Sequence, residues 1–186
     1  MRFQLSKFPA KTALAAVAMA VSLLVGVEGL STKPYQDTGG VWTICYGETQ
    51  GVTAKTPVAT KEKCFGMLNE EAADVAAKIT PFLPAILNSN QLAALISFCY
   101  NVGVQACKNS TLFLYINEGK MELVPAQFAR WVYVDRKDCR IRKNNCYGLV
   151  ERRQAEMTLF TKPVSDNPPT KGRSTNDDHC CCKPGH

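Results

Sequence analysis

The sequence predicts an α+β fold that is mostly helical, with an N-terminal signal-anchor segment, and three features of the chain lead to this expectation. Apolar residues recur at helical spacing in several segments after residue 60. Residues 29–53 are instead rich in Gly and Thr around a short run of branched and aromatic residues, which is typical of a small hairpin. The first 27 residues combine a cationic start with an apolar stretch.

The N-terminal segment has the pattern of an export signal. Arg2, Lys7 and Lys11 precede residues 12–27, which contain no charged side chain. Three interpretations remain open: a cleaved signal peptide with a small-x-small site at 18–20, an uncleaved anchor, and a buried core helix. The segment is shorter than the ~20 apolar residues of a stable transmembrane helix, so an anchor of this kind is only marginally stable in a bilayer.

The body of the chain alternates predicted elements with turns. A turn at residues 37–40 precedes a strand at 41–46, and helices are predicted over 61–79 and 92–102, the second after a capping box of Asn88 and Gln91. Further on, we expect a short helix from Ser110 or Thr111 to Gly119, an apolar segment at 125–132, and a last helix at 148–162. Residues 165–186 have the polar composition of a disordered tail.

Bulk composition limits the possible functions without assigning one. The chain has 186 residues, 46% of them hydrophobic and 20% charged, which fits one globular domain. Its net charge of +6 favours a polyanionic partner. The basic residues are scattered rather than interleaved with aromatics along one stripe, so we expect no nucleic-acid binding.

The nine cysteines indicate an oxidising compartment. The positions of six of them suggest three disulfides, although six cysteines allow 15 pairings. The suggested pairs are Cys45 with Cys64, Cys99 with Cys107, and Cys139 with Cys146. A zinc site is the competing interpretation, but these six contain no C-x-x-C, and the two histidines, His179 and His186, lie in the tail. We therefore expect neither a metal nor another cofactor.

Two carboxyl groups stand in contrasting surroundings. Glu28 directly follows the apolar segment, where it is either a stop to that segment or a functional group beside apolar residues. Asp37 lies in a polar, Gly-rich turn, and Thr43 follows on the predicted strand. Carboxyls in different environments can divide glycoside cleavage between a proton donor and an ionised group that activates water, which a Thr hydroxyl can position. This spacing is common by chance and assigns no enzyme by itself.

The residues around these carboxyls carry a family resemblance. Residues 27–47, VEGLSTKPYQDTGGVWTICYG, closely resemble the active-site signature of the phage-type lysozyme family. Three later blocks agree in order and spacing: NQLAALISFCYNVG from Asn90, NSTLFLYINEG from Asn109, and GLVERRQAE from Gly148. Together they cover about residues 27–162. The resemblance implies a lysozyme-like fold with a small β-hairpin region and a helical lobe.

The resemblance also implies an activity. The expected protein is a monomeric endolysin, a muramidase that cuts the β-1,4 bond between N-acetylmuramic acid and N-acetylglucosamine in peptidoglycan. Glu28 would be the general acid, Asp37 and Thr43 would place and activate water, and the anomeric centre would be inverted. A non-catalytic wall-binding protein on a lysozyme scaffold, a lytic transglycosylase and a chitinase remain as alternatives.

An arginine is expected to support the catalytic glutamate. Arg153 falls where the family places an arginine that pairs with that glutamate, and the neighbouring Arg152 is a close alternative. Either arginine could instead belong to the surface of the last helix, with Arg152 pairing with Glu156 at i,i+4.

Other positions are assigned only by the resemblance. Tyr100, Asn101 and Gly103 fall where the family lines its sugar-binding cleft, although Tyr100 could serve the core instead. The chain departs from the family at Glu48, where members commonly have His. This change removes a local ion pair and adds a carboxylate near the expected cleft.

The N-terminus resembles that of the lambdoid signal-arrest-release endolysins, which are exported while tethered by a weak anchor. This likeness divides the chain into an anchor or signal peptide (1–27), a catalytic domain (28–164) and the tail (165–186). Residues 12–27 would hold the protein in the inner membrane before its release into the periplasm. Because residues 1–27 contain no cysteine, thiol exchange from the anchor is excluded and membrane depolarisation is the expected trigger.

Overall fold

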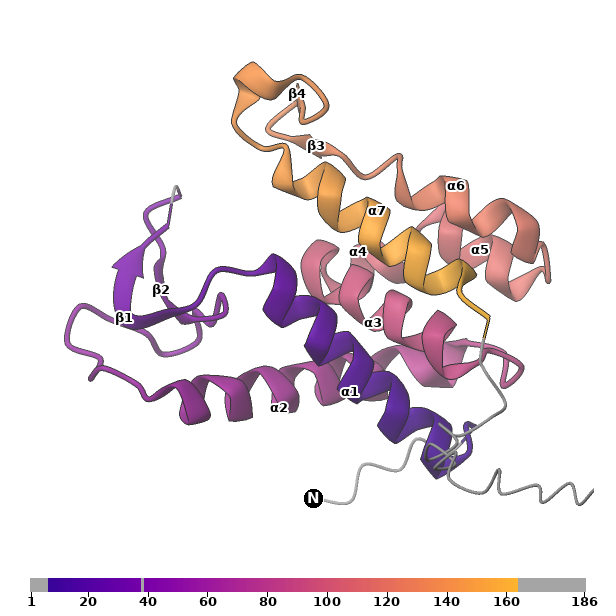
Figure 1. Ribbon diagram of the computed structural model, residues 1–186, viewed down its shortest axis with the longest axis horizontal. Helices are drawn as coiled ribbons and strands as arrows, with labels where there is room; N and C mark the ends of the chain where they lie inside the picture. The colour runs from indigo at the N-terminus through magenta and orange to yellow at the C-terminus, as the bar shows by residue number, and fades with distance from the viewer. Residues whose placement is uncertain (1–6, 38, 164–186) are drawn as a thin grey trace, which may run out of the picture.

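The computed structural model describes residues 7–37 and 39–163 and confirms a mostly helical α+β fold (Figure 1). The helices of this part are α1 (Ala10–Val27), α2 (Lys61–Ile79), α3 (Ser89–Val102), α4 (Val104–Lys108), α5 (Thr111–Asn117), α6 (Val124–Phe128) and α7 (Gly148–Thr161). Strands β1 (Ser31–Gln36) and β2 (Trp42–Cys45) form one antiparallel pair, and β3 (Tyr133–Val134) and β4 (Lys137–Asp138) form another. The predicted tail at 165–186 lies outside the described residues.

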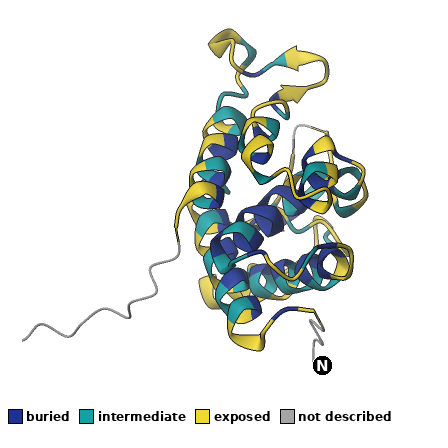
Figure 2. Cartoon of the chain, turned by 90° about the vertical axis from the view of Figure 1, so that its right-hand side faces the viewer, coloured by how far each residue is buried: buried dark blue, intermediate teal, exposed yellow. Residues whose placement is uncertain are grey.

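Helix α3 is the centre of the core. The capping box of Asn88 and Gln91 starts it as predicted, and residues 92–99 are all buried, so the helix is covered on every side rather than on one apolar face. Helices α1, α2 and α7 pack against it. Figure 2 shows the buried segments gathered inside this helical body, with exposed residues on its outer surface.

Helix α1 combines a buried face with an exposed apolar face. Ala16, Ala20 and Leu24 repeat every four residues and are fully buried, which aligns them on one side of the helix. On the other side Leu14 is 75% exposed. Of the described helices, only α1 is long and apolar enough to cross a membrane, with a mean hydropathy of 2.0 over 18 residues. In this state, therefore, the predicted anchor segment is a partly buried helix of the core.

The β1–β2 hairpin follows α1 immediately. Its register pairs Tyr35 with Thr43 and Gln36 with Trp42, and a bulge interrupts the pairing between Ser31 and Tyr35. Figure 1 shows this hairpin on one side of the C-terminal end of α1 and the helical lobe on the other. The end of α1 thus lies between the two parts of the fold.

All three expected disulfides are present. Their pairs are Cys45 with Cys64, Cys99 with Cys107, and Cys139 with Cys146, at sequence separations of 19, 8 and 7. The first connects the end of β2 to the beginning of α2 and so attaches the hairpin to the helical part.

The disulfide of the longest loop is expected to stabilise the fold most. Cross-linking a longer loop removes more entropy from the unfolded chain, so replacing Cys45 and Cys64 with Ser should lower the free energy of unfolding by about 3 kcal/mol. The matched Cys139→Ser/Cys146→Ser variant should lose about 2 kcal/mol. Urea denaturation measures both losses, and a reversed order would contradict the loop-length argument.

Candidate active site

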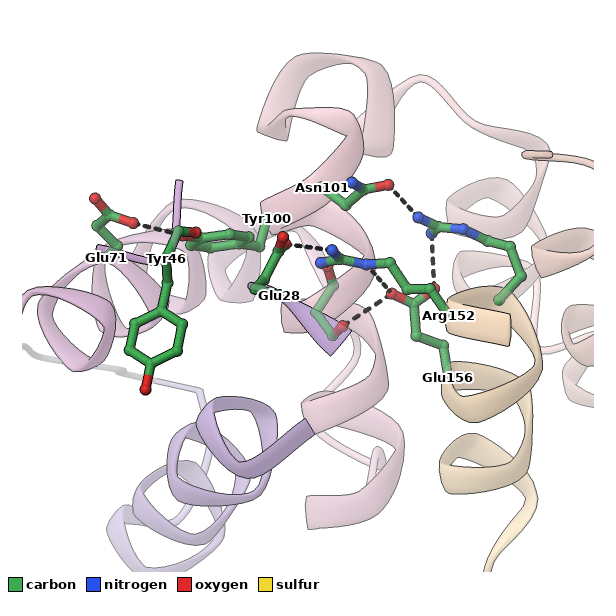
Figure 3. A network of polar contacts seen from close by, with 9 residues as sticks. Glu28, Tyr46, Glu71, Tyr100, Asn101, Arg152 and Glu156 are labelled. Atoms are coloured by element: carbon green, nitrogen blue, oxygen red, sulfur yellow. Dashed lines mark hydrogen bonds and ion pairs between the residues drawn. The ribbon is translucent and has the colours of Figure 1, made fainter. Parts of the chain in front are cut away.

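Glu28 is held at the junction of the helical lobe and the hairpin. It is the C-cap of α1, where its backbone N–H donates to the Leu24 carbonyl at 2.8 Å. Its side chain is 26% exposed and forms an ion pair with the Arg152 guanidinium of α7 (Figure 3). A carboxyl group that follows a buried helix directly has little freedom to move, so α1 fixes the position of Glu28.

The arginine that pairs with Glu28 is Arg152 and not Arg153, which corrects the assignment made from the sequence. Consecutive helical residues point about 100° apart, so Arg152 and Arg153 leave α7 in different directions. Arg152 faces Glu28, whereas Arg153 turns to Asn101 at the end of α3 and donates a hydrogen bond to its Oδ1.

Glu156 connects the two arginines. Its Oε1 lies 3.2 Å from Arg152 Nε and its Oε2 lies 2.7 Å from Arg153 Nη1, while Ser97 Oγ donates to Oε1 at 2.8 Å. The Arg152–Glu156 pair expected at the surface is therefore present but buried, since the two side chains are only 5% and 0% exposed. Arg152 also donates to the Ser97 carbonyl at 3.1 Å, which fixes its orientation.

Burial changes the proton affinities in this cluster. Loss of hydration raises the pKa of the Glu156 carboxyl, and the positive charges of Arg153 and Arg152 oppose that shift. Burial also lowers the pKa of Arg153 to about 10, against the attraction of Glu156. With that pKa Arg153 remains cationic at neutral pH, so the cluster carries positive charge near Glu28.

Asp37 and Thr43 lie on the hairpin. Asp37 closes the turn after β1, and its Oδ1 accepts hydrogen bonds from the backbone N–H groups of Gly39 and Val41, both at 2.9 Å. Its Oδ2 receives no hydrogen bond from the described residues. Thr43 is buried on β2 and donates its hydroxyl hydrogen to the Val41 carbonyl at 3.0 Å, so its oxygen remains an acceptor.

The three residues assigned to the sugar-binding cleft lie at the end of α3. Asn101 accepts the hydrogen bond from Arg153, and Tyr100 lies beside Glu28 in Figure 3. Gly103 ends α3 and begins α4 with a φ of 85°, a conformation that glycine adopts without strain. The structure thus brings Glu28, Tyr100 and Asn101 into one region. They lie beside Arg152, Arg153 and Glu156, which we call the arginine cluster.

Tyr100 also joins this region to a pair of carboxyl groups. Its hydroxyl donates to Glu71 Oε2 at 2.7 Å and lies 3.3 Å from the Tyr46 carbonyl. Burial and a hydrogen bond with Glu48 raise the pKa of Glu71 from 4.5 to about 7, whereas that hydrogen bond lowers the pKa of Glu48. Below about pH 7 the pair therefore binds one proton, mainly through Glu71.

Glu71 should make stability depend on pH. The unfolded chain releases this proton near pH 4.5 and the folded protein near pH 7, so the folded state binds more protons in that window. The free energy of unfolding should then fall as pH rises through the window. Glu71→Gln removes this dependence. Its free energy of unfolding, relative to that of the wild type, should therefore rise by about 1 kcal/mol between pH 4.5 and 8, a value reduced because solvent screens a half-exposed group.

Thermal denaturation across this pH range measures the Glu71 effect. Glu70→Gln is the matched control, because Glu70 precedes Glu71 on the same helix and is exposed. A constant difference between Glu71→Gln and the wild type at all pH values would contradict the shared proton.

A cavity of about 880 Å³ opens beside these carboxyls. Its lining includes Gly47, Glu48, Glu71 and Tyr100, but not Glu28, Asp37 or Thr43. The candidate site is therefore the region around Glu28, and the cavity is a neighbouring space. Tyr100 lies between this cavity and the arginine cluster.

Sequence reasoning placed Glu156 in a surface pair with Arg152 and missed Ser97 and Glu71 as parts of this region. Glu156 had a usable signal, because a carboxylate four residues after Arg152 and three after Arg153 can reach both on one helix. No pattern in the sequence connects Ser97 or Glu71 with the site, since their partners lie 59 and 29 residues away.

The fold agrees with that of known proteins. Residues 25–156 match the family described as phage lysozyme, and the chain belongs to that family. It is accordingly a glycoside hydrolase.

Its curated relatives are phage endolysins. The SAR-endolysin of Enterobacteria phage P21 is 35% identical over 150 residues, covering 77% of this chain and 87% of that protein. The SAR-endolysin of Escherichia phage 933W is 37% identical over 137 residues, covering 71% and 77%. Together with the apolar helix α1, these relatives indicate export.

Solved structures share the fold. The muramidase domain of SpmX from Asticaccaulis excentricus superposes with a TM-score of 0.68 at 26% identity, and a P22 lysozyme variant with a TM-score of 0.65 at 28% identity. Each comparison covers 77% of this chain and 95% of the other. The lysozyme-like fold expected from the sequence is thereby confirmed.

Proposed function

We propose that the chain is a monomeric endolysin that hydrolyses the β-1,4 bond between N-acetylmuramic acid and N-acetylglucosamine in peptidoglycan. Membership of the phage lysozyme family supports this substrate. The observation that carries the proposal is the ion pair of Glu28 with Arg152 at the end of α1, because it places a carboxyl group at the junction of hairpin and helical lobe beside a fixed positive charge.

In the proposed reaction, Glu28 donates its proton to the glycosidic oxygen as the bond from that oxygen to the anomeric carbon breaks. Asp37 removes a proton from a water molecule that attacks the opposite face of the sugar, and Thr43 Oγ accepts the other hydrogen of that water. Asp37 Oδ2, which accepts no hydrogen bond from the described part of the chain, and the acceptor oxygen of Thr43 suit these tasks. Direct attack by water inverts the anomeric centre.

Arg152 can remain beside Glu28 whether Glu28 is protonated or ionised. Glu156 and the Ser97 carbonyl already share the charge of Arg152, so a protonated Glu28 leaves no isolated cation. After Glu28 has donated its proton, Arg152 stabilises the carboxylate that remains.

Product analysis tests the proposed activity. Digestion of purified peptidoglycan should give muropeptides with reducing ends, and the first-formed anomer should be α, which NMR detects before mutarotation. Anhydro-sugar ends would instead identify a lytic transglycosylase, and cleavage of chitin oligomers alone a chitinase. Binding to peptidoglycan without any product would identify a non-catalytic wall-binding protein.

We propose further that residues 12–27 tether the protein to the inner membrane before it is released into the periplasm. The apolar character of α1 supports a membrane-inserted state, and only 28% of its span is buried in the folded protein. Insertion would remove Ala16, Ala20 and Leu24 from the core and hold Glu28 at the membrane surface, so the site could not assemble. The two packings of α1 would then form a bistable switch.

Fractionation of intact cells before and after collapse of the membrane potential tests the tether. We expect full-length protein in the membrane fraction first and in the periplasm afterwards, and the released protein should retain residues 1–27. Detection of a shortened soluble form alone would show ordinary secretion with signal cleavage and would refute the tether.

A further inference from the structure

The segment from Tyr133 to Cys146 forms a protruding hairpin that the proposed reaction does not use. We call it the basic hairpin (residues 133–146); it contains β3, a two-residue turn, β4 and a 3-10 turn at Arg142–Asn144. Figure 1 shows it extending from the helical lobe beyond the start of α7, and Figure 2 shows that its surface is largely exposed. Within the described residues, no ion pair connects it to Glu28, Arg152, Arg153 or Glu156.

The charge of the basic hairpin is unbalanced. Its 14 residues include five cations and two carboxylates, a net charge of +3 and half of the +6 of the whole chain. Arg140 forms an ion pair with Asp138, with 2.7 Å between Arg140 Nη2 and Asp138 Oδ2. Within the described residues, the other four cations form no ion pair; they are Arg136, Lys137, Arg142 and Lys143.

Apolar side chains lie among these cations on the same exposed hairpin. Val134 is 45% exposed and Ile141 is 46% exposed, and Tyr133 is exposed as well. A soluble polyanion would pair with the cations but would leave these aliphatic groups in water. The interface of a lipid bilayer accepts both kinds of side chain, because its phosphates attract the cations and its acyl boundary receives the apolar groups.

The backbone holds this surface in one conformation. The Cys139–Cys146 disulfide closes its base, and Asn144 donates a side-chain hydrogen bond to the Asp138 carbonyl at 2.8 Å. At the tip, Asp135 and Arg136 have φ values of 48° and 65°, as in a two-residue hairpin turn in which glycine is favoured at the second position. The chain has a cation where glycine would form the turn more easily.

We infer that the basic hairpin is a docking surface for the anionic phospholipid face of a membrane. The surface would act separately from α1, since it lies on the folded domain and contains none of the residues of the predicted anchor. It would keep the folded protein near a lipid surface through its four unpaired cations and its exposed Val134 and Ile141.

Vesicle co-sedimentation of the full chain tests the docking surface. The vesicles contain phosphatidylethanolamine with about 30% phosphatidylglycerol, or phosphatidylcholine alone. Arg136→Gly/Lys137→Ser should bind the anionic vesicles about tenfold less tightly, and glycine suits the turn at position 136. Lys61→Ser/Lys63→Ser removes the same charge from exposed positions of α2 and should change binding less than about twofold.

A variant without the exposed aliphatic groups separates lipid from wall polymer. Val134→Ser/Ile141→Ser should weaken binding to anionic vesicles severalfold while binding to purified peptidoglycan sacculi stays unchanged. Equal losses in the hairpin and α2 charge variants would overturn the proposal in favour of unspecific charge attraction. Full vesicle binding by Val134→Ser/Ile141→Ser, with loss of sacculus binding in the charge variant, would overturn it in favour of a wall polymer. Unchanged circular dichroism and cleavage of soluble peptidoglycan oligomers of several disaccharide units verify that each variant folds.

Discussion

Replacing Glu28 with Gln is expected to lower the rate of peptidoglycan cleavage at least about 100-fold, because a general acid contributes about 10² to 10⁴ to such rates and an amide cannot donate its proton in this way. The fold should survive the change. Gln can still accept a hydrogen bond from Arg152, and the replaced side chain is partly exposed, so the free energy of unfolding should change by no more than about 1 kcal/mol.

The comparison for Glu28→Gln is Glu151→Gln, which removes a carboxylate from an exposed position on α7. This control should keep the wild-type rate of turbidity loss in a suspension of purified cell walls. Substantial clearing by Glu28→Gln, with a fold confirmed by denaturation, would show that position 28 is not the proton donor.

Replacing Glu156 with Gln is expected to cause the largest loss of stability of any single change considered for this protein. The side chain is completely buried between two arginines, and its replacement leaves Arg153 without its carboxylate and Arg152 with Glu28 alone. Breaking a buried ion pair in this way costs about 3–5 kcal/mol. Arg152 would also lose a group that orients it toward Glu28, so activity should fall at temperatures at which the variant remains folded.

Urea denaturation of Glu156→Gln measures this loss against the same Glu151→Gln control, which should lie within about 0.5 kcal/mol of the wild type. A Glu156→Gln variant of wild-type stability would mean that the arginines find other partners. Glu156 would then not be needed to hold the two arginines of the site.

Periodicity in the sequence was sufficient to predict the main helices. The capping box at Asn88 placed the start of α3 correctly, and the last predicted helix matches α7 to within one residue at its end. Local rules work here because caps and apolar spacing act within a few residues along the chain. The β3–β4 hairpin was not predicted, since each strand has only two residues and the turn contains no glycine.

The site was predicted only where a motif fixes it. The signature around Glu28, Asp37 and Thr43 identified candidates whose catalytic roles remain proposals. Which of Arg152 and Arg153 pairs with Glu28 depends on how α7 is rotated about its axis relative to α1 and α3. This rotation is set by packing between segments that lie more than 100 residues apart in the sequence. The sharing of a proton by Glu48 and Glu71 likewise depends on the contact of a loop with α2, which local sequence does not encode.

The dependence of kcat/KM on pH tests the division of labour between Glu28 and Asp37 most directly. With the wild type we expect a bell-shaped profile, because the proton donor must be protonated and the group that activates water must be ionised. The residual activity of Glu28→Gln should lose the alkaline limb and that of Asp37→Asn the acidic limb. Retention of both limbs by either variant would contradict the roles assigned to these two carboxyls.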